Sequence, residues 1–143
     1  MINGKVTSPA ATIKHIDSLK KSTVQAVKMS VAKATLAIHA EAIKVVSEND
    51  GGSSAIRRGK NVTVSDPFSP PHTDTGVLRK SIKFNIDANG ENGEVGSNLK
   101  YASWLEFGTA TMAPRPWLSV AVENMKDKIG SIFFNFIEKE IKK

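Results

Sequence analysis

Residues 101–122, YASWLEFGTATMAPRPWLSVAV, contain the only tyrosine and both tryptophans of the chain, together with a Pro-Arg-Pro sequence. Tyr101, Trp104 and Leu105 have helical spacing, and Gly108 is a typical stop for a helix. Burying rings of this size contributes roughly 1.5 to 3 kcal/mol each. We therefore interpret the stretch as scaffolding, in which four rings pack a short helix and the start of a last helix against a sheet: Tyr101, Trp104, Phe107 and Trp117.

Prolines set the path of the chain after this short helix. Pro114 and Pro116 restrict their own backbone and disfavour helix in the residues before them, so residues 109–117 are expected to be largely extended. Pro116 suits the first turn of a final helix over about residues 116–141. That helix carries one apolar stripe and a flanking one, formed by Leu118, Val122, Met125, Ile129, Ile132 and Phe136 and by Phe133, Ile137 and Ile141. The apolar side broadens toward the C-terminus, and we expect part of it to meet another subunit.

Two charged residues lie among apolar neighbours in the same region. An unpaired charge at Glu106 or Arg115 would be costly if the side chain is buried. We expect the two residues to form an ion pair, or to cap backbone groups where the short helix, the extended segment and the last helix meet. This interpretation is favoured over contact with a ligand.

Alternating residues upstream predict a β-hairpin. In residues 81–88, SIKFNIDA, every second side chain is apolar, which is typical of a half-buried strand with one face formed by Ile82, Phe84 and Ile86. Asn-Gly turn chemistry in residues 89–93 then leads into a returning strand at residues 94–97, EVGS.

A short helical turn is expected just before this hairpin, in residues 74–82, DTGVLRKSI. Asp74 or Thr75 can cap it, and Gly76 permits close backbone approach. Two apolar residues point the same way from it, Leu78 and Ile82.

Residues 49–73 are rich in Gly, Ser and Pro and lack helical periodicity. A connection of this length in a small domain is usually functional or flexible. Its segment AIRRGKNVTVS, residues 55–65, either forms a hairpin with Gly59 near the turn or remains a disordered loop. The tip of such an arm would be basic and would face a partner subunit or nucleic acid through Arg57, Arg58 and Lys60.

A long helix is predicted from Pro9 to about Glu48, with a break or bend near Ser22 as an alternative to one straight helix. Ser8 is a suitable N-cap before a proline at the first helical position, and Asn-Asp-Gly-Gly follows as a stop. Apolar residues at spacings of three and four form a narrow stripe, Val24, Val27, Val31, Ala34, Ile38, Ala42 and Val45. Three lysines seven residues apart form a row beside it, which we interpret as a solvated flank: Lys14, Lys21 and Lys28.

Together these elements predict a single α+β domain over residues 1–143. Its long N-terminal helix and its C-terminal helix pack on a small antiparallel β-sheet, and a long loop or hairpin arm over about residues 49–73 joins the first helix to the sheet. The chain has no cysteine, no signal peptide and no apolar run long enough to cross a membrane, so we expect a soluble intracellular product. Its net charge of +6 is moderate and spread along the chain, which makes nucleic-acid binding the alternative function.

No catalytic or metal-binding motif is present in the sequence, and we expect no enzymatic activity and no cofactor. The acid–base candidates are His15, His39, His72, Asp74 and Glu106. His15 and His39 are 24 residues apart on the predicted helix. A straight helix of that length spans roughly 36 Å, so these two cannot share a site within one subunit.

The succession of these motifs resembles the head-to-tail joining and tail-completion proteins of tailed bacteriophages, often described as minor tail components. Members of that family show a long first helix, a Thr-Gly-x-Leu-Arg-x-Ser-Ile element, a hairpin, a Tyr-Ala-x-x-x-Glu-Phe-Gly-Thr element and a Pro-x-Arg-Pro-Phe-like start of the last helix. The matching positions here are Thr75, Gly76, Leu78, Arg79, Ser81 and Ile82; Tyr101, Ala102, Glu106, Phe107, Gly108 and Thr109; and Pro114, Arg115, Pro116 and Trp117. The order and spacing cover about residues 10–140.

The resemblance implies a structural virion protein, made in the cytoplasm of a bacterial host. Such proteins form a ring, commonly sixfold, in the phage neck, between the head-closure ring and the tail terminator or tail tube. A ring around a DNA channel would tolerate a basic lumen, and the residues that would line it are Lys14, Lys21, Lys28, Arg57, Arg58 and Lys60. Two other classes compete with this interpretation: a free nucleic-acid-binding protein, which would bind DNA strongly and with steep salt dependence, and a regulatory or toxin-like protein.

Overall fold

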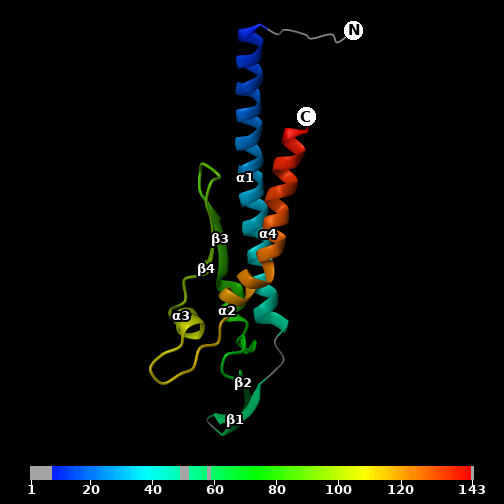
Figure 1. Ribbon diagram of the computed structural model, residues 1–143. Coiled ribbons are helices and arrows are strands. Elements are labelled where there is room, and N and C mark those ends of the chain that lie inside the picture. Colours follow the sequence, from blue (N-terminus) through cyan, green and yellow to red (C-terminus); the bar gives the residue numbers. More distant parts are fainter. Residues whose placement is uncertain (1–7, 49–51, 58, 143) are drawn as a thin grey trace.

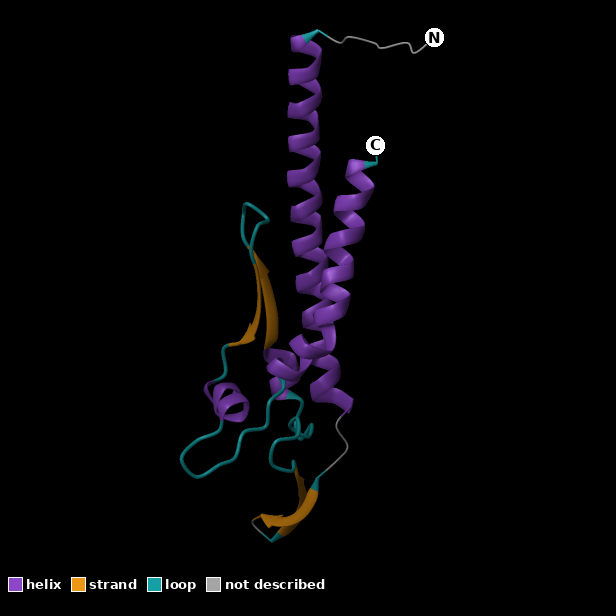
Figure 2. Cartoon of the chain, in the orientation of Figure 1, coloured by secondary structure: helices purple, strands orange, loops and turns teal. Residues whose placement is uncertain are grey.

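The structure is a computed structural model that describes residues 8–48, 52–57 and 59–142 (Figure 1). It has the predicted α+β architecture: two long helices lie side by side, and two small hairpins and two short helices flank them (Figure 2). In chain order the elements are α1 (Pro9–Glu48), β1 (Ser53–Arg57), β2 (Lys60–Val64), α2 (Val77–Ser81), β3 (Ile82–Ile86), β4 (Gly93–Ser97), α3 (Lys100–Phe107) and α4 (Leu118–Ile141).

Helix α1 is continuous and has the predicted bounds, so the alternative of a break near Ser22 is wrong. Its N-terminus is closed by Ser8, whose carbonyl oxygen accepts hydrogen bonds from the backbone N–H groups of Ala11 and Thr12 at 3.0 and 3.2 Å. The Ser22 and Thr23 hydroxyls both donate to the Leu19 carbonyl, which satisfies them without interrupting the helix.

Helices α1 and α4 run antiparallel and pack through small side chains. The buried residues of α1 are Ala26, Ser30, Ala34, Thr35, Ala42 and Val46, and Ala121 of α4 is fully buried. Small residues at such a seam allow two helix axes to approach closely. The predicted stripe is therefore only partly correct: Ala34 and Ala42 are buried, but Val24 is exposed and the other valines are half-buried.

The strands form two separate two-stranded antiparallel sheets, as expected for a hairpin arm that is set apart from the sheet. The hairpin expected within residues 55–65 is present as β1 and β2, and Gly59 at its turn has a φ of 76°. The second hairpin, β3 and β4, packs along α1, where the rings of His39 and Phe84 meet edge to face at 5.1 Å. Its predicted apolar face is confirmed at Ile82, which is buried, whereas Phe84 is 44% exposed.

Two predicted helix starts are wrong in detail. The N-cap residue of helix α2 is Gly76, whose φ of 71° is a left-handed conformation that favours glycine. No side-chain hydrogen bond caps this helix, so the capping expected from Asp74 or Thr75 is wrong. Helix α4 begins at Leu118, so Pro116 precedes the helix and does not lie in its first turn.

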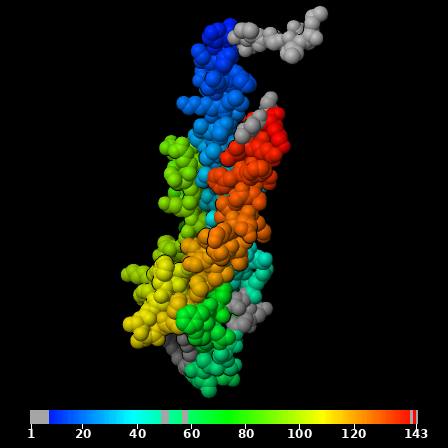
Figure 3. All heavy atoms as spheres, in the orientation of Figure 1, coloured from blue at the N-terminus to red at the C-terminus, as the bar shows by residue number. Residues whose placement is uncertain are grey.

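The core joins the C-terminal end of α1 to α2, β3, α3 and the start of α4. Its buried residues are Ala42, Val46, Leu78, Ile82, Ala102, Trp117 and Ala121. Figure 3 shows the resulting shape, an elongated molecule in which the N-terminal part of α1 stands clear of the other elements. Within the described ranges, no helix is both long enough and apolar enough to cross a membrane.

Candidate functional site

The junction of α3 and α4 is organised by the carboxylate of Glu106. This residue lies on the inner side of α3 and is 8% exposed. Its Oε2 accepts hydrogen bonds from the backbone N–H groups of Trp117 and Leu118 at 2.8 and 2.9 Å, and its Oε1 accepts from the backbone N–H of Ser119 at 2.9 Å and from the Ser119 hydroxyl at 2.5 Å. These amides are among the first of α4, which have no partners within their own helix. Glu106 therefore caps α4 from a neighbouring helix.

The environment of Glu106 keeps it ionised at neutral pH. Burial by itself raises the pKa of this carboxyl group, but the hydrogen bonds from Ser119, Leu118 and Trp117 favour the charged form and outweigh it. The net effect is a pKa below its ordinary value of 4.5. A negative charge at the N-terminus of α4 is also favoured by the helix dipole.

Arg115, in the extended segment, also makes hydrogen bonds with backbone groups. Its Nε donates to the Ser65 carbonyl at 2.9 Å, and its backbone N–H donates to the Leu105 carbonyl at 2.6 Å. None of the ion pairs found among the described residues joins it to Glu106. The predicted ion pair is thus wrong. The predicted capping is confirmed for Glu106, whereas the Arg115 side chain bonds a carbonyl of the segment after β2, outside the three elements expected to meet here.

The aromatic residues of this region divide into one buried ring and three exposed ones. Trp117 is 3% exposed, and its indole N–H donates to the Ala102 carbonyl at 3.2 Å. In contrast, Tyr101 is 37% exposed, Trp104 is 54% exposed and Phe107 is 80% exposed. The predicted packing of all four rings is therefore wrong for the three on α3. Helix α3 turns its small and aliphatic side inward, through Ala102 and Leu105, and its aromatic side outward.

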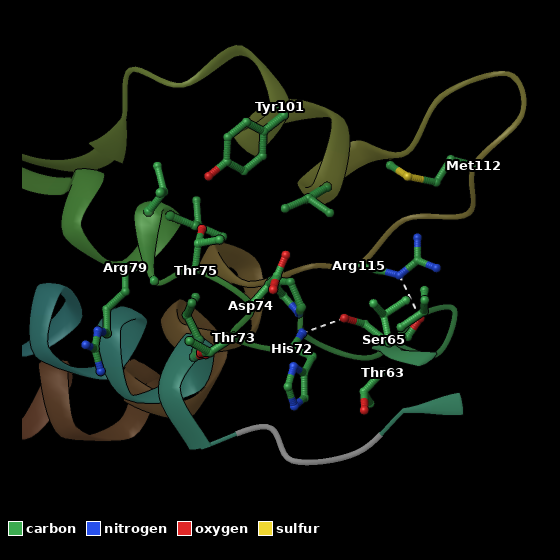
Figure 4. A pocket seen from close by; sticks show the side chains of 18 of the residues that line it. Thr63, Ser65, His72, Thr73, Asp74, Thr75, Arg79, Tyr101, Met112 and Arg115 are labelled. Carbon is green, nitrogen blue, oxygen red and sulfur yellow. Dashed lines mark hydrogen bonds between the residues drawn. The ribbon is translucent and has the colours of Figure 1, made fainter. Parts of the chain in front are cut away.

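A groove of about 810 Å³ lies beside this junction, bounded by the end of α1, β2, the segment before α2, and α3 (Figure 4). Tyr101 and Met112 lie along one edge of it and Thr63 and His72 along the other (Figure 4). Hydrogen bonds hold its wall together: the His72 backbone N–H donates to Ser65 Oγ at 2.5 Å, and the Thr73 hydroxyl donates to the Val46 carbonyl.

The residues of the Thr-Gly-x-Leu-Arg element, just before β3, lie around this groove. Leu78 is buried in the core, Gly76 makes the left-handed turn before α2, and Thr75 and Arg79 are exposed on the groove wall. At the other end of the site, Gly108 ends α3 with a φ of 77°, and Thr109 pairs with Met112 across a tight turn. Pro116 is half-buried between this turn and α4.

The acid–base candidates are divided among separate places, and only two of the five line one groove. His15 is exposed near the start of α1, while the Nε2 of His39 lies 3.3 Å from the Ile82 carbonyl oxygen. His72 and Asp74 line the groove, and Glu106 is occupied by the α4 amides. Among the described residues, no group of three or more His, Cys, Asp or Glu has the geometry of a metal site.

The basic residues predicted to line a channel do not form one patch within the subunit. Lys14 and Lys21 are exposed on α1, Lys28 is half-buried beside the β3–β4 turn, and Lys60 is exposed on the β1–β2 hairpin beyond the other end of α1 (Figure 1). The side chain of Arg57 and the whole of Arg58 lie outside the described residues.

Three residues of the site were not anticipated from the sequence. Ser119 and Ser65 are hydrogen-bond partners of the two charged residues, and no local pattern marks them. Phe68 has a φ of 64°, which is unusual for a bulky residue, and its ring is exposed. Its backbone N–H donates to the Pro114 carbonyl at 2.8 Å, which fixes this turn to the extended segment. The sequence Asp-Pro-Phe-Ser indicates a turn but not its handedness.

Comparison with known proteins identifies one family. A family model described as "Bacteriophage HK97-gp10, putative tail-component" matches residues 10–108, which is more than half of the chain and includes α1, both hairpins and α3. No curated protein and no solved structure gives a significant match.

Proposed function

The chain belongs to the HK97-gp10-like family of bacteriophage tail components, and from this membership we propose that it is a structural protein of the phage neck. In this proposal it forms a ring, most simply a hexamer, that joins the DNA-filled head, through the head-closure ring, to the tail terminator or tail tube. Its location is the virion, and its role is mechanical and not catalytic. No cofactor takes part.

The observation that carries the proposal is the excess of surface on the isolated subunit. A compact monomer of 15.4 kDa would expose about 7,200 Å². This chain exposes 10379 Å². A standard interface covers about 800 Å² on each partner, so the excess would serve contacts on more than one side of the subunit.

The exposed surface carries large apolar side chains on several elements. They include Ile13, Ile16, Leu19 and Met29 of α1, Trp104 and Phe107 of α3, and Val122 and Phe134 of α4. Apolar residues spread over separate faces suit a subunit that contacts two neighbours in a ring and other proteins above and below it.

A complementation experiment tests the proposal. The gene is deleted from the phage that carries it, and particles are examined by electron microscopy. We expect filled heads and complete tails to accumulate separately, and addition of the purified protein to restore joined, infectious particles. As a control for the preparation, the Glu123→Gln variant, altered at an exposed ion pair with Lys126, is expected to restore joining fully.

Normal joining in the absence of the protein would overturn the proposal. Tight binding of duplex DNA by the isolated subunit, weakening steeply as salt is raised, would instead favour a nucleic-acid-binding protein. In the neck, DNA contact is expected to be weak and non-specific, made by exposed lysines such as Lys14, Lys21 and Lys60 that face the channel.

A further inference from the structure

None of the described residues packs against the first third of α1. Every residue from Ser8 to Lys21 is exposed, and α1 continues well past the end of α4 (Figure 1). An isolated helix of this length is only marginally stable in water. We call residues 9–21 the α1 extension.

The α1 extension continues the side of α1 that packs against α4. Farther along the helix, the Nζ of Lys33 lies 5.6 Å from the centre of the Phe136 ring, which marks the α4-facing side. Leu19 lies two heptads before Lys33, so it is on the same side of the helix, and Ile16 is next to it, 57% exposed. The seam with α4 thus runs on into an apolar strip against which no described residue packs.

The opposite side of the α1 extension is basic. Lys14 and Lys21 lie in one heptad row with Lys28, which contacts the turn of the β3–β4 hairpin and marks the side away from the apolar strip. Lys20 lies at the edge of the strip. Of these lysines only Lys20 borders the strip, four residues after Ile16, so a partner should offer apolar surface with acidic groups beside it.

The outward side of α4 has this chemistry. Phe134 is 65% exposed and points away from α1, since it lies two residues before Phe136 and a step of two turns a helix by about 200°. Asp127 precedes it by seven residues and Glu138 follows it by four, so both carboxylates flank the ring on the same side. Glu138 pairs with Lys142, but pairs at the surface exchange readily.

Gly130 is an independent mark of the same surface. It is an exposed glycine in the middle of α4, one turn before Phe134, and a Cβ there would meet nothing within 4 Å. Glycine weakens a helix, and no contact among the described residues accounts for its presence. Because this position has no side chain, a second helix can lie close to the backbone of α4.

We propose that the α1 extension of one copy packs on the outward side of α4 of a second copy, with Ile16 and Leu19 against Phe134 and Gly130. Lys20, at the edge of the strip, then lies near the carboxylates of Asp127 and Glu138. Because the two surfaces differ, each copy can donate its extension to one neighbour and receive that of the other. Such a contact closes a ring when its rotation allows. The ring rests on the proposed function, whereas the helix contact does not.

Cysteine crosslinking tests this contact without background, because the chain has no cysteine of its own. Two variants are purified, Ile16→Cys and Phe134→Cys, both altered at exposed side chains. They are mixed at the highest soluble concentration and oxidised mildly. We expect a disulfide-linked product containing one chain of each kind, in several-fold excess over either homodimer. Ser18→Cys, altered on another side of the extension, is the matched control and should give several-fold less product with Phe134→Cys.

Equal yields from the Ser18 and Ile16 variants, no crosslinked product, or a predominance of Ile16→Cys homodimers would each overturn the contact. The phage assay separates it from the proposed function. If the double variant Ile16→Glu, Leu19→Glu restores head–tail joining as well as the unaltered chain does, the contact is wrong and the neck role stands. If the crosslink forms but gene loss leaves joining intact, the contact stands and the neck role is wrong.

Discussion

Replacing Glu106 by Gln tests the view that one buried carboxylate fixes α3 to the start of α4. Gln has almost the same size and shape, so packing is conserved. It carries no charge, however, and one of its two terminal groups is a donor. In the native protein Oε2 accepts from the amides of Trp117 and Leu118, and Oε1 accepts from the amide and the hydroxyl of Ser119. Whichever way the Gln side chain is turned, one of these pairs of donors loses its acceptor.

The expected loss of stability follows from these contacts. A hydrogen bond to a charged group contributes about 1.5 to 3 kcal/mol, and removal of a helix cap costs about 0.5 to 2 kcal/mol. Because the amide retains one acceptor, we expect the free energy of unfolding to fall by about 2 to 3 kcal/mol at neutral pH. For a chain of this length, that corresponds to a decrease in Tm of roughly 5 to 12 °C.

The effect should depend on pH in one direction. The pKa of Glu106 is lowered in the folded protein relative to its ordinary value of 4.5. The ionised group therefore contributes stability that is fully present above 4.5 and is lost as the pH falls through the lower, folded pKa. The difference between the native protein and Glu106→Gln should be constant from neutral pH down to this region and should shrink below it.

Urea unfolding, followed by tryptophan fluorescence over this pH range, measures the difference directly. Glu123→Gln is the matched control, because its carboxylate makes only an exposed ion pair, and it should change stability by less than about 0.5 kcal/mol. The reasoning is refuted if Glu106→Gln is as stable as the control at neutral pH, or if its deficit persists unchanged in acid.

Three further substitutions probe other parts of the fold. Trp117→Ala should cost about 3 to 5 kcal/mol, because the ring is buried, whereas Trp104→Ala should cost less than about 1 kcal/mol; urea unfolding compares them, and equal losses would contradict the assignment of one ring as core and the other as surface. Gly93→Ala should loosen the β3–β4 hairpin, because a Cβ there would overlap the Thr35 side chain, and faster amide hydrogen exchange in both strands would report it; unchanged exchange would count against this packing. Phe68→Asn should raise the Tm measured by calorimetry, because Asn tolerates a φ of 64° better than Phe, and a lower Tm would show that the Phe68 ring makes stabilising contacts.

The parts of the fold that could be predicted from the sequence are those fixed by local chemistry. Ser8 and Pro9 start α1 and the run of Asn, Asp and Gly ends it, so both bounds follow from capping preferences. The turn glycine at Gly59 and the Asn-Gly turn chemistry after β3 place both hairpins. For residues 55–65 the sequence left a hairpin and a disordered loop open, because the turn chemistry at Gly59 does not by itself decide whether the flanking strands pair.

The inward side of α3 could not be predicted for a different reason. Spacing places Tyr101, Trp104 and Phe107 on one side of the helix, but it does not say whether that side faces the core. In larger helices the apolar side is normally the buried one. Here the inner side is Ala102 and Leu105, because the buried ring of Trp117 already fills the adjoining space and leaves room only for small and aliphatic side chains.

The segment between α3 and α4 explains how these exposed rings keep a fixed orientation. It makes three hydrogen-bonded connections to the inner side of α3: the Arg115 amide to the Leu105 carbonyl, the Trp117 indole to the Ala102 carbonyl, and the α4 amides to Glu106. All three use polar groups, so α3 is positioned without burying its own rings. The Pro-Arg-Pro-Trp sequence thus holds in place a helix whose apolar side remains on the surface. A helix that only completed the core would need no such hydrogen bonds, because its own buried rings would hold it in place. The arrangement instead suits a subunit that presents a rigid aromatic surface to another protein.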